Sequence, residues 1–357
     1  YAEPGPLFED RSAWLGHIHT DLPFVSEAGQ PLLPRHLSQL GPGIAWTDSD
    51  GDGDPDLVVG AGAGGSLTTF QNVDGRLRAG GASARLEYDA TTILPGIDGR
   101  TLLVGVANYE APSPEVARAV APAWSVRIGT AGLGPLTPAL SSDGGSTGPL
   151  ASADVDGDGD LDVFVGGRAY QSAYPIVPTS RLFLREDDGT LVYDSVRSAP
   201  LSRVGLVSGA TFTDIDGDAD SDLVLAIDWG PPRLFINEGG RFFDQTRDWG
   251  LAPYQSWWNV VTTGDLDGDG RTDLVLTSWG RNTGLSPTAD RPLLGYWGDF
   301  DRSGTLDFLL GTFDDRIGAV APISDLVSLS RGLPFVRTQT TTTFEAYAYA
   351  SMAQLLG

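Results

Sequence analysis

The chain has 357 residues, of which 47 are acidic and 23 basic, giving a formal net charge of −24. Nucleic acids and anionic membranes both attract basic patches, so this acidity argues against either as a partner. Cysteine is absent, which excludes disulfides and thiol chemistry, and no run of 18 apolar residues predicts a membrane span. Because the sequence begins at Tyr1 rather than Met, we expect a processed or partial product.

Residues 1–40 are predicted to form an extended arm, because five prolines interrupt this stretch. His17 and His19 alternate and would share one face of a strand. We interpret them as a partly buried structural pair, with a zinc or iron site as the alternative.

The first acidic loop covers residues 48–56. Asp48, Asp50 and Asp52 alternate along the chain, Gly53 follows, and Asp56 closes the loop before a short apolar strand. At an effective dielectric near 20, two such charges ~4 Å apart repel each other by about 4 kcal/mol. A hard divalent cation removes this repulsion, and a ligand set made only of oxygen selects Ca²⁺ over zinc or copper.

The spacing within this loop matches part of an EF-hand. Side chains at positions 1, 3 and 5 bind, glycine at position 6 turns the chain, and position 7 offers its backbone carbonyl. Aspartate at position 9 replaces the usual closing glutamate, and β-prone segments flank the loop in place of helices. We therefore predict a hairpin between two strands that is closed by a metal ion. A solvated acidic loop is the alternative.

The same nine-residue pattern occurs five times, each time ahead of an apolar strand. The candidate ligands at positions 1, 3, 5, 7 and 9 are Asp48, Asp50, Asp52, Asp54 and Asp56; Asp154, Asp156, Asp158, Asp160 and Asp162; Asp214, Asp216, Asp218, Asp220 and Asp222; Asp265, Asp267, Asp269, Arg271 and Asp273; and Asp299, Asp301, Ser303, Thr305 and Asp307. Ala219 replaces one turn glycine, and Ser303 replaces a carboxylate. We expect about four or five Ca²⁺ ions.

A sixth copy has lost its ligands, since Ile93, Pro95 and Ile97 stand before the apolar strand at 101–104. With this copy included, the loops start at 48, 93, 154, 214, 265 and 299, at intervals of 45, 61, 60, 51 and 34 residues. A four-stranded propeller blade takes roughly 40–50 residues. The pattern predicts an all-β fold, a β-propeller of six or seven four-stranded blades over residues 41–320.

Residues 321–357 are predicted to be a separate C-terminal segment with a helix over 343–356. Apolar residues recur at helical spacing there, and Thr342 with Glu345 forms a capping box. A helix packed on the propeller and a docking element for another subunit are both open interpretations.

The acidic repeats, each followed by an apolar strand, resemble the FG-GAP/VCBS repeats of integrin-type β-propellers. The order of these repeats along the sequence is similar to that of the bacterial branch associated with ASPIC/UnbV and cartilage-acidic-protein-like sequences. The matching stretches are 148–168, 205–230, 257–280 and 291–310, within a coverage of 41 to 345. The resemblance implies an extracytoplasmic, calcium-dependent propeller that works as a binding or scaffold module, with the metal ligands at the aspartates named above.

These observations favour a non-catalytic interaction scaffold in the periplasm or outside the cell. The preferred version is an accessory subunit docked on a larger membrane-associated complex. We expect no enzyme, because the chain has three His, no Cys and no Gly-x-Ser-x-Gly motif; a propeller hydrolase is the remaining catalytic alternative. Carbohydrate binding is a further alternative, with Trp229, Trp249, Trp279 and Trp297 as candidates for an exposed rim.

Overall fold

The computed structural model describes residues 10, 12–96, 100–129, 132–280, 283–341 and 343–357. Strands dominate and the helices are short. The chain forms two compact units. The first contains Tyr1–Pro23, Leu40–Ala107 and Ala121–Ser141, and the second contains Phe24–Gln39, Asn108–Val120 and Ser142–Gly357. The predicted arm is thus divided between the units after Pro23.

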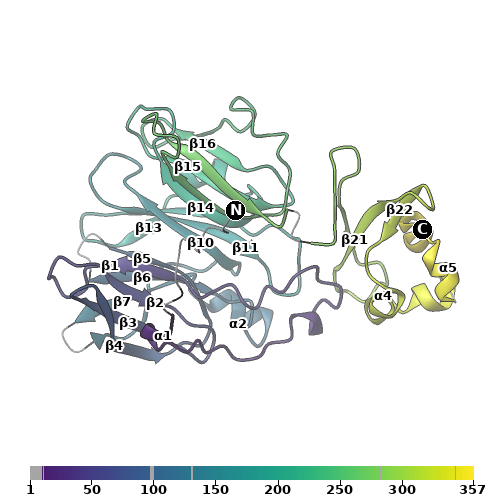
Figure 1. The fold of residues 1–357 in the computed structure, drawn as a ribbon, viewed down its shortest axis with the longest axis horizontal. Helices are drawn as coiled ribbons and strands as arrows, with labels where there is room; N and C mark the ends of the chain where they lie inside the picture. Colours follow the sequence, from purple (N-terminus) through teal and green to yellow (C-terminus); the bar gives the residue numbers. More distant parts are fainter. Residues whose placement is uncertain (1–9, 11, 97–99, 130–131, 281–282, 342) are drawn as a thin grey trace, which may run out of the picture. The chain divides into compact units, whose positions relative to one another are not determined.

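The first unit contains two antiparallel sheets whose main strands follow one another in chain order (Figure 1). One sheet consists of β1 (Ile44–Thr47), β2 (Asp56–Val59), β3 (Ser66–Val73) and β4 (Arg76–Arg85). The other consists of β5 (Asp89–Pro95), β6 (Thr101–Ala107), β7 (Ala123–Gly129), β8 (Gly132–Leu133) and β9 (Thr137–Pro138). Between them lies a core that includes Val58, Leu67 and Leu102, all fully buried. A short helix, α1 (Ser12–Leu15), precedes both sheets.

The second unit holds the remaining sheets. Two of them have four strands each: β10 (Ser146–Ala153), β11 (Asp162–Ala169), β12 (Arg181–Arg185) and β13 (Leu191–Tyr193), then β14 (Leu206–Thr213), β15 (Asp222–Asp228), β16 (Arg233–Asn237) and β17 (Phe242–Asp244). The next has two, β18 (Trp258–Gly264) and β19 (Asp273–Ser278), and the last has three, β20 (Leu294–Gly298), β21 (Asp307–Asp314) and β22 (Ala319–Pro322). The prediction of uniformly four-stranded blades is therefore wrong for the described part of the chain.

The first strands of successive sheets pack side by side within each unit, β1 against β5 and then β10 against β14 against β18. These backbones lie so close that glycine is required. A Cβ added to Gly148 would lie 2.6 Å from the carbonyl oxygen of Val207, and one added to Gly209 would lie 2.9 Å from the amide nitrogen of Val261. Curled antiparallel sheets packed through their first strands are consistent with a propeller.

The C-terminal segment contains α4 (Leu326–Gly332), a π-helical turn at Val336–Thr340, α5 (Phe344–Ala348) and α6 (Met352–Leu356). The prediction of one helix over 343–356 is wrong, because Ser351 starts a new helix there. Its hydroxyl accepts from the Gln354 amide while the Gln354 side chain accepts from the Ser351 amide, which is a capping box. The predicted cap at Thr342 lies outside the described residues, and Thr343 caps α5 instead.

Two further helices are short. α2 (Pro114–Ala119) lies in the segment Asn108–Val120 of the second unit and is capped by Ser113, and α3 (Ser195–Ser198) is capped by Asp194. The C-terminal helices pack on the last sheet, where Met352, Leu355 and Leu309 share a buried cluster. None of the helices in the described part of the chain has the length and apolar character needed to cross a lipid bilayer.

Candidate metal centres

Each acidic loop is a tight hairpin that joins the first strand of a sheet to the second. The carboxylate at position 1 folds back over the loop and accepts hydrogen bonds from the backbone. In the first loop the amides of Gly51 and Gly53 donate to Asp48 at 2.8 and 3.1 Å, and in the second those of Gly157 and Gly159 donate to Asp154 at 2.8 and 3.0 Å. These contacts fix the first carboxylate in place.

Two backbone positions in each loop have a positive φ, at positions 4 and 6. Glycine fills most of them, since it reaches this conformation without steric strain. Ala219 adopts φ 74° at position 6, which confirms that it takes on the turn conformation of the glycine it replaces. Arg302 adopts φ 59° at position 4, where the other four loops have glycine.

The loops bring carboxylate oxygens together within 4.8 Å of one another. The groups include Asp48, Asp50 and Asp56; Asp154, Asp156 and Asp162; Asp214, Asp216 and Asp218; and Asp265, Asp267 and Asp269. In the second loop one oxygen of Asp156 is buried and has no hydrogen-bond partner among the described residues, while the other lies 3.5 Å from the Arg197 guanidinium. A buried carboxylate oxygen without a partner is costly, and a cation bound among these oxygens would satisfy it. The donor set therefore fits Ca²⁺.

Side chains at position 5 point back into the loop and accept from the amide at position 7. The pairs are Asp54 to Asp52 at 2.9 Å, Asp160 to Asp158 at 2.9 Å, Asp220 to Asp218 at 2.8 Å, Arg271 to Asp269 at 2.9 Å and Thr305 to Ser303 at 3.3 Å. In the last loop the Ser303 amide also donates to Asp299 at 2.8 Å and to Asp301 at 3.0 Å. Ser303 thus keeps the loop shape, although its hydroxyl brings no charge.

The aspartate at position 9, here called the ninth aspartate, is buried in four of the five loops and half-buried in the loop that Asp273 closes. In every loop one of its oxygens accepts from the amide at position 2; for Asp222 the donor is Ile215, at 2.9 Å. Desolvation by burial raises the pKa of Asp162 and of Asp307 to about 6, and it also raises the pKa of Asp222. A nearby cation would favour the ionised form and oppose this shift.

The other oxygen of the ninth aspartate is used by the third strand in each complete four-stranded sheet. The amides of Asn72, Arg185 and Asn237 donate to Asp56, Asp162 and Asp222 at 2.8, 2.9 and 2.8 Å. The side chains of the same three residues donate to the carbonyl at position 8, on Pro55, Leu161 and Ser221, at 3.3, 3.1 and 3.2 Å. The sequence prediction missed these residues. The sequence contains a pattern that marks them, because a phenylalanine precedes each of them by two positions.

In the last loop the carbonyl at position 8 accepts a hydrogen bond from a residue of the arm instead of the third strand. The side chain of Gln30, which is 1% exposed, donates to the carbonyl of Leu306 at 2.8 Å. It also donates to the carbonyl of Tyr174 and accepts from the Tyr174 amide, both at 2.9 Å. A residue of the arm thus takes the place of the third-strand side chain in this sheet.

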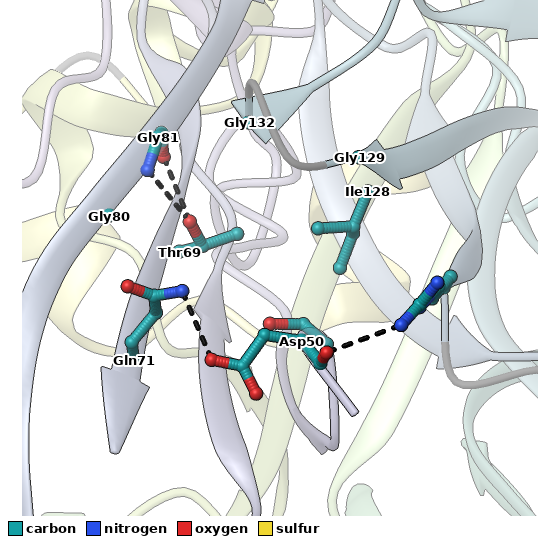
Figure 2. A pocket seen from close by; sticks show the side chains of 10 residues that line it. Asp50, Thr69, Gln71, Gly80, Gly81, Ile128, Gly129 and Gly132 are labelled. Atoms are coloured by element: carbon teal, nitrogen blue, oxygen red, sulfur yellow. Dashed lines mark hydrogen bonds between the residues drawn. The ribbon is translucent and has the colours of Figure 1, made fainter. Parts of the chain in front are cut away.

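A pocket of about 410 Å³ lies beside the first loop, within the first unit (Figure 2). Figure 2 shows the amide of Gln71 directed at the carboxylate of Asp50, a contact of 3.2 Å. Arg100 donates to the Asp50 carbonyl, also at 3.2 Å. Position 2 is Ser49 here, where the other loops carry Val, Ile, Leu or Phe, so this loop adds a hydroxyl to the wall of the pocket.

The copy predicted to lack ligands contains no acidic loop in its described part. Ile93 and Pro95 belong to β5, and Ile97 lies outside the described residues. The candidate rim tryptophans fall into two groups. Trp279 stacks on the buried Trp257 and Trp229 lies tilted against it, with ring centroids 4.3 and 4.7 Å apart, whereas Trp249 and Trp297 are 44% and 53% exposed.

Several solved structures are similar to this chain. A gluconolactonase from Xanthomonas campestris is 17% identical over 62% of this chain and 65% of its own, with a TM-score of 0.39. A candidate 6-phosphogluconolactonase from Bacteroides fragilis is 13% identical over 79% and 82%, with a TM-score of 0.38, and Sqt1 of Saccharomyces cerevisiae is 10% identical over 78% and 59%, with a TM-score of 0.37. The chain thus spans less than two thirds of the gluconolactonase and of Sqt1.

These structures correct the expectation that the chain is not an enzyme, because two of them are described as lactonases. The expectation is withdrawn, and at these TM-scores no activity takes its place. No curated protein matches this chain in sequence. The FG-GAP-like repeat family matches residues 214–276, which contain two of the acidic loops described above. Over this stretch the chain carries an FG-GAP-like repeat.

Proposed function

We propose that this protein is a calcium-stabilised β-propeller outside the cytoplasm that serves as a protein–protein interaction scaffold. The observation that carries the calcium assignment is the recurrent cluster of carboxylates, above all the buried oxygen of Asp156 that has no partner. Four or five ions would be held by the aspartates at positions 1, 3, 5 and 9 and by the carbonyl at position 7. The sheets would form a propeller of six or seven blades, and each metal hairpin would join the first two strands of its blade.

Calcium would act on stability and would restrict where the protein works. Extracellular calcium modules bind with Kd values of ~10⁻⁴–10⁻³ M. With free Ca²⁺ at ten times Kd, each site adds about 1.4 kcal/mol, so five sites add ~7 kcal/mol, comparable with the net stability of a whole domain. Cytosolic Ca²⁺ is too low to fill such sites, which favours the periplasm or the cell exterior.

The interaction role follows from the resemblance to FG-GAP/VCBS propellers and to their ASPIC/UnbV-associated branch. The preferred version remains an accessory subunit docked on a larger membrane-associated complex, bound through the arm or the C-terminal segment. Its net charge of −24 opposes binding to nucleic acids and to anionic lipid.

Two experiments test this proposal. Calorimetry with Ca²⁺ after removal of metal by EDTA should show several sites, and Mg²⁺ serves as the control cation. Isolation from native membranes under mild conditions should recover the protein with a specific partner in the presence of Ca²⁺. Absence of calorimetric Ca²⁺ binding contradicts the metal assignment, and recovery of the protein alone contradicts the accessory-subunit role.

Carbohydrate binding is the second candidate. It is favoured by the exposed rings of Trp249 and Trp297, which could each stack on a sugar. A glycan array tests it directly. Binding that disappears in both Trp249→Ala and Trp297→Ala would support this role over the protein scaffold.

A further inference from the structure

The fifth sheet, made of β18 and β19, has an open edge. In the described residues nothing pairs with β19 on the side away from β18. Residues 274–276 are half-buried, whereas the equivalent residues 223–225 in β15 are completely buried. Asp273 is likewise half-exposed, although the ninth aspartates of the other four loops are buried. The edge of β19 thus offers backbone groups and apolar side chains to another strand.

The three complete sheets show what kind of strand occupies this position. The residue that follows the ninth aspartate always lies opposite a phenylalanine of the third strand. These pairs are Leu57 with Phe70, Val163 with Phe183, and Leu223 with Phe235. Two residues after the phenylalanine comes Asn or Arg, which makes the paired contacts to the ninth aspartate and to the carbonyl at position 8. The third strand is therefore recognised as Phe-x-Asn or Phe-x-Arg.

The fifth sheet presents the same two acceptors on the fourth loop. Among the described residues nothing donates to the second oxygen of Asp273 or to the carbonyl of Thr272, and Leu274 faces no phenylalanine. The last loop, which also lacks a third-strand donor, has its position 8 carbonyl satisfied by Gln30. In each of the other four loops, therefore, a side chain donates to the carbonyl at position 8.

No described segment of the printed sequence is free to provide the missing strand. Residues 279–293, which follow β19, contain no phenylalanine. Phe335 and Arg337 have the right spacing, but Val336 between them is completely buried in the C-terminal cluster. Phe300 and Arg302 also have it, but they lie within the last metal loop.

We infer that β19 is completed by an extended segment of a partner protein that contains Phe-x-Asn or Phe-x-Arg and adds as an antiparallel third strand. Its phenylalanine packs opposite Leu274, and its Asn or Arg donates to Asp273 and to Thr272. Arg at this position gains further from the four aspartates of the loop. The inference rests on the proposed scaffold function and identifies the surface that carries it, by strand addition to an open sheet edge.

A peptide taken from this chain is the probe. The segment 231–238, Pro-Pro-Arg-Leu-Phe-Ile-Asn-Glu, contains a third strand and can be synthesised with a fluorescent label. In Ca²⁺ it should bind the protein saturably and protect the amides of residues 274–276 from hydrogen exchange. Peptides with Phe235→Ala or Asn237→Ala should bind about tenfold or more weakly, since each removes a buried contact. Because these changes are in the peptide, unfolding of the protein cannot explain their effect.

Protein variants provide the matched control. Leu274→Glu places a charge on the β19 edge and should abolish peptide binding, whereas Val192→Glu on the outer strand β13, where Val192 is 48% exposed, should leave binding unchanged. Equal binding of all three peptides, protection of a different strand, or absence of saturable binding overturns the inference. Protection of β19 that rises with protein concentration alone indicates a second copy as the occupant and also overturns it. Calcium calorimetry on the same samples distinguishes these results from failure of the metal assignment.

Discussion

Asp222→Asn and Asp273→Asn are equivalent substitutions that should have different effects on the metal-free protein. Both residues are ninth aspartates. Asp222 accepts from the amide of Ile215 at 2.9 Å and from that of Asn237 at 2.8 Å, so its two oxygens are both used. Asp273 accepts only from the amide of Leu266, at 2.9 Å, among the described residues. Asparagine has a single carbonyl oxygen and can replace only one of two acceptors.

The structure gives the size of the difference. Asp222→Asn leaves one buried amide without an acceptor and removes a hydrogen bond to a charged group, which is worth about 1.5–3 kcal/mol. Burial raises the pKa of Asp222, which means that its charged form is costly to bury, so removal of the charge offsets part of the lost hydrogen-bond energy. We therefore expect the free energy of unfolding to fall by about 1–2.5 kcal/mol. Asp273→Asn retains its single contact and should change stability by no more than about 0.5 kcal/mol.

The assay is urea unfolding in EDTA, followed by hydrogen exchange to place the effect on β15 and β16. EDTA is required, because with Ca²⁺ both variants also lose a negative ligand. Equal destabilisation by the two substitutions would refute the reasoning, since it would mean that the third strand contributes nothing through the ninth aspartate.

Four further outcomes are expected. Saturating Ca²⁺ should raise the melting temperature well above that in EDTA, while Mg²⁺ should have little effect; equal melting curves would contradict metal binding. Asp162 and Asp307 have pKa values raised to about 6, against an ordinary value of 3.8. In EDTA their protonation therefore stabilises the folded protein, fully below pH 4, and this stabilisation is lost as the pH rises through 6. Unfolding midpoints in EDTA should be higher at pH 5 than at pH 7.5, and Ca²⁺ should reverse this order. Gly209→Ala should destabilise by roughly 1–3 kcal/mol, because its Cβ would meet a backbone atom of the neighbouring sheet, whereas Gly264→Ala, with open space around it, should be tolerated in thermal unfolding. Gln30→Ala should lower the free energy of unfolding by roughly 1–3 kcal/mol in urea unfolding, since it leaves buried backbone groups without partners; Gln30→Glu should restore only the acceptor, and unchanged stability in both would contradict the described contacts.

The sequence was sufficient to locate the acidic loops, because their shape depends on contacts within nine residues. Alternating aspartates and a turn glycine specify both the hairpin and the strand that follows, and this holds even where Ala219 replaces the glycine. The same local character explains the error at the C-terminus. Ser351 and Gln354 form a capping box that interrupts the helix, a signal that was present in the sequence but outweighed by the apolar spacing on either side.

Contacts between distant residues could not be predicted in this way. Gln30 and Leu306 are 276 positions apart, and no periodicity connects them. The two-stranded fifth sheet is similar: the short interval between Asp265 and Asp299 indicated an unusual blade, but not which strands were missing. Whether an edge is paired depends on the sum of packing and pairing over the whole unit, which a single pattern of residues does not contain.

If the loops hold Ca²⁺ as proposed, the shared use of the ninth aspartate links cation binding to strand alignment. One carboxylate serves the loop, the ion and the third strand together, so a third strand that slips by one residue would remove its amide from the carboxylate and turn its phenylalanine to the opposite face. A misaligned sheet would therefore hold its ion more weakly than a correctly aligned one. By mass action, calcium in the surroundings would then stabilise correctly aligned sheets over misaligned ones during folding.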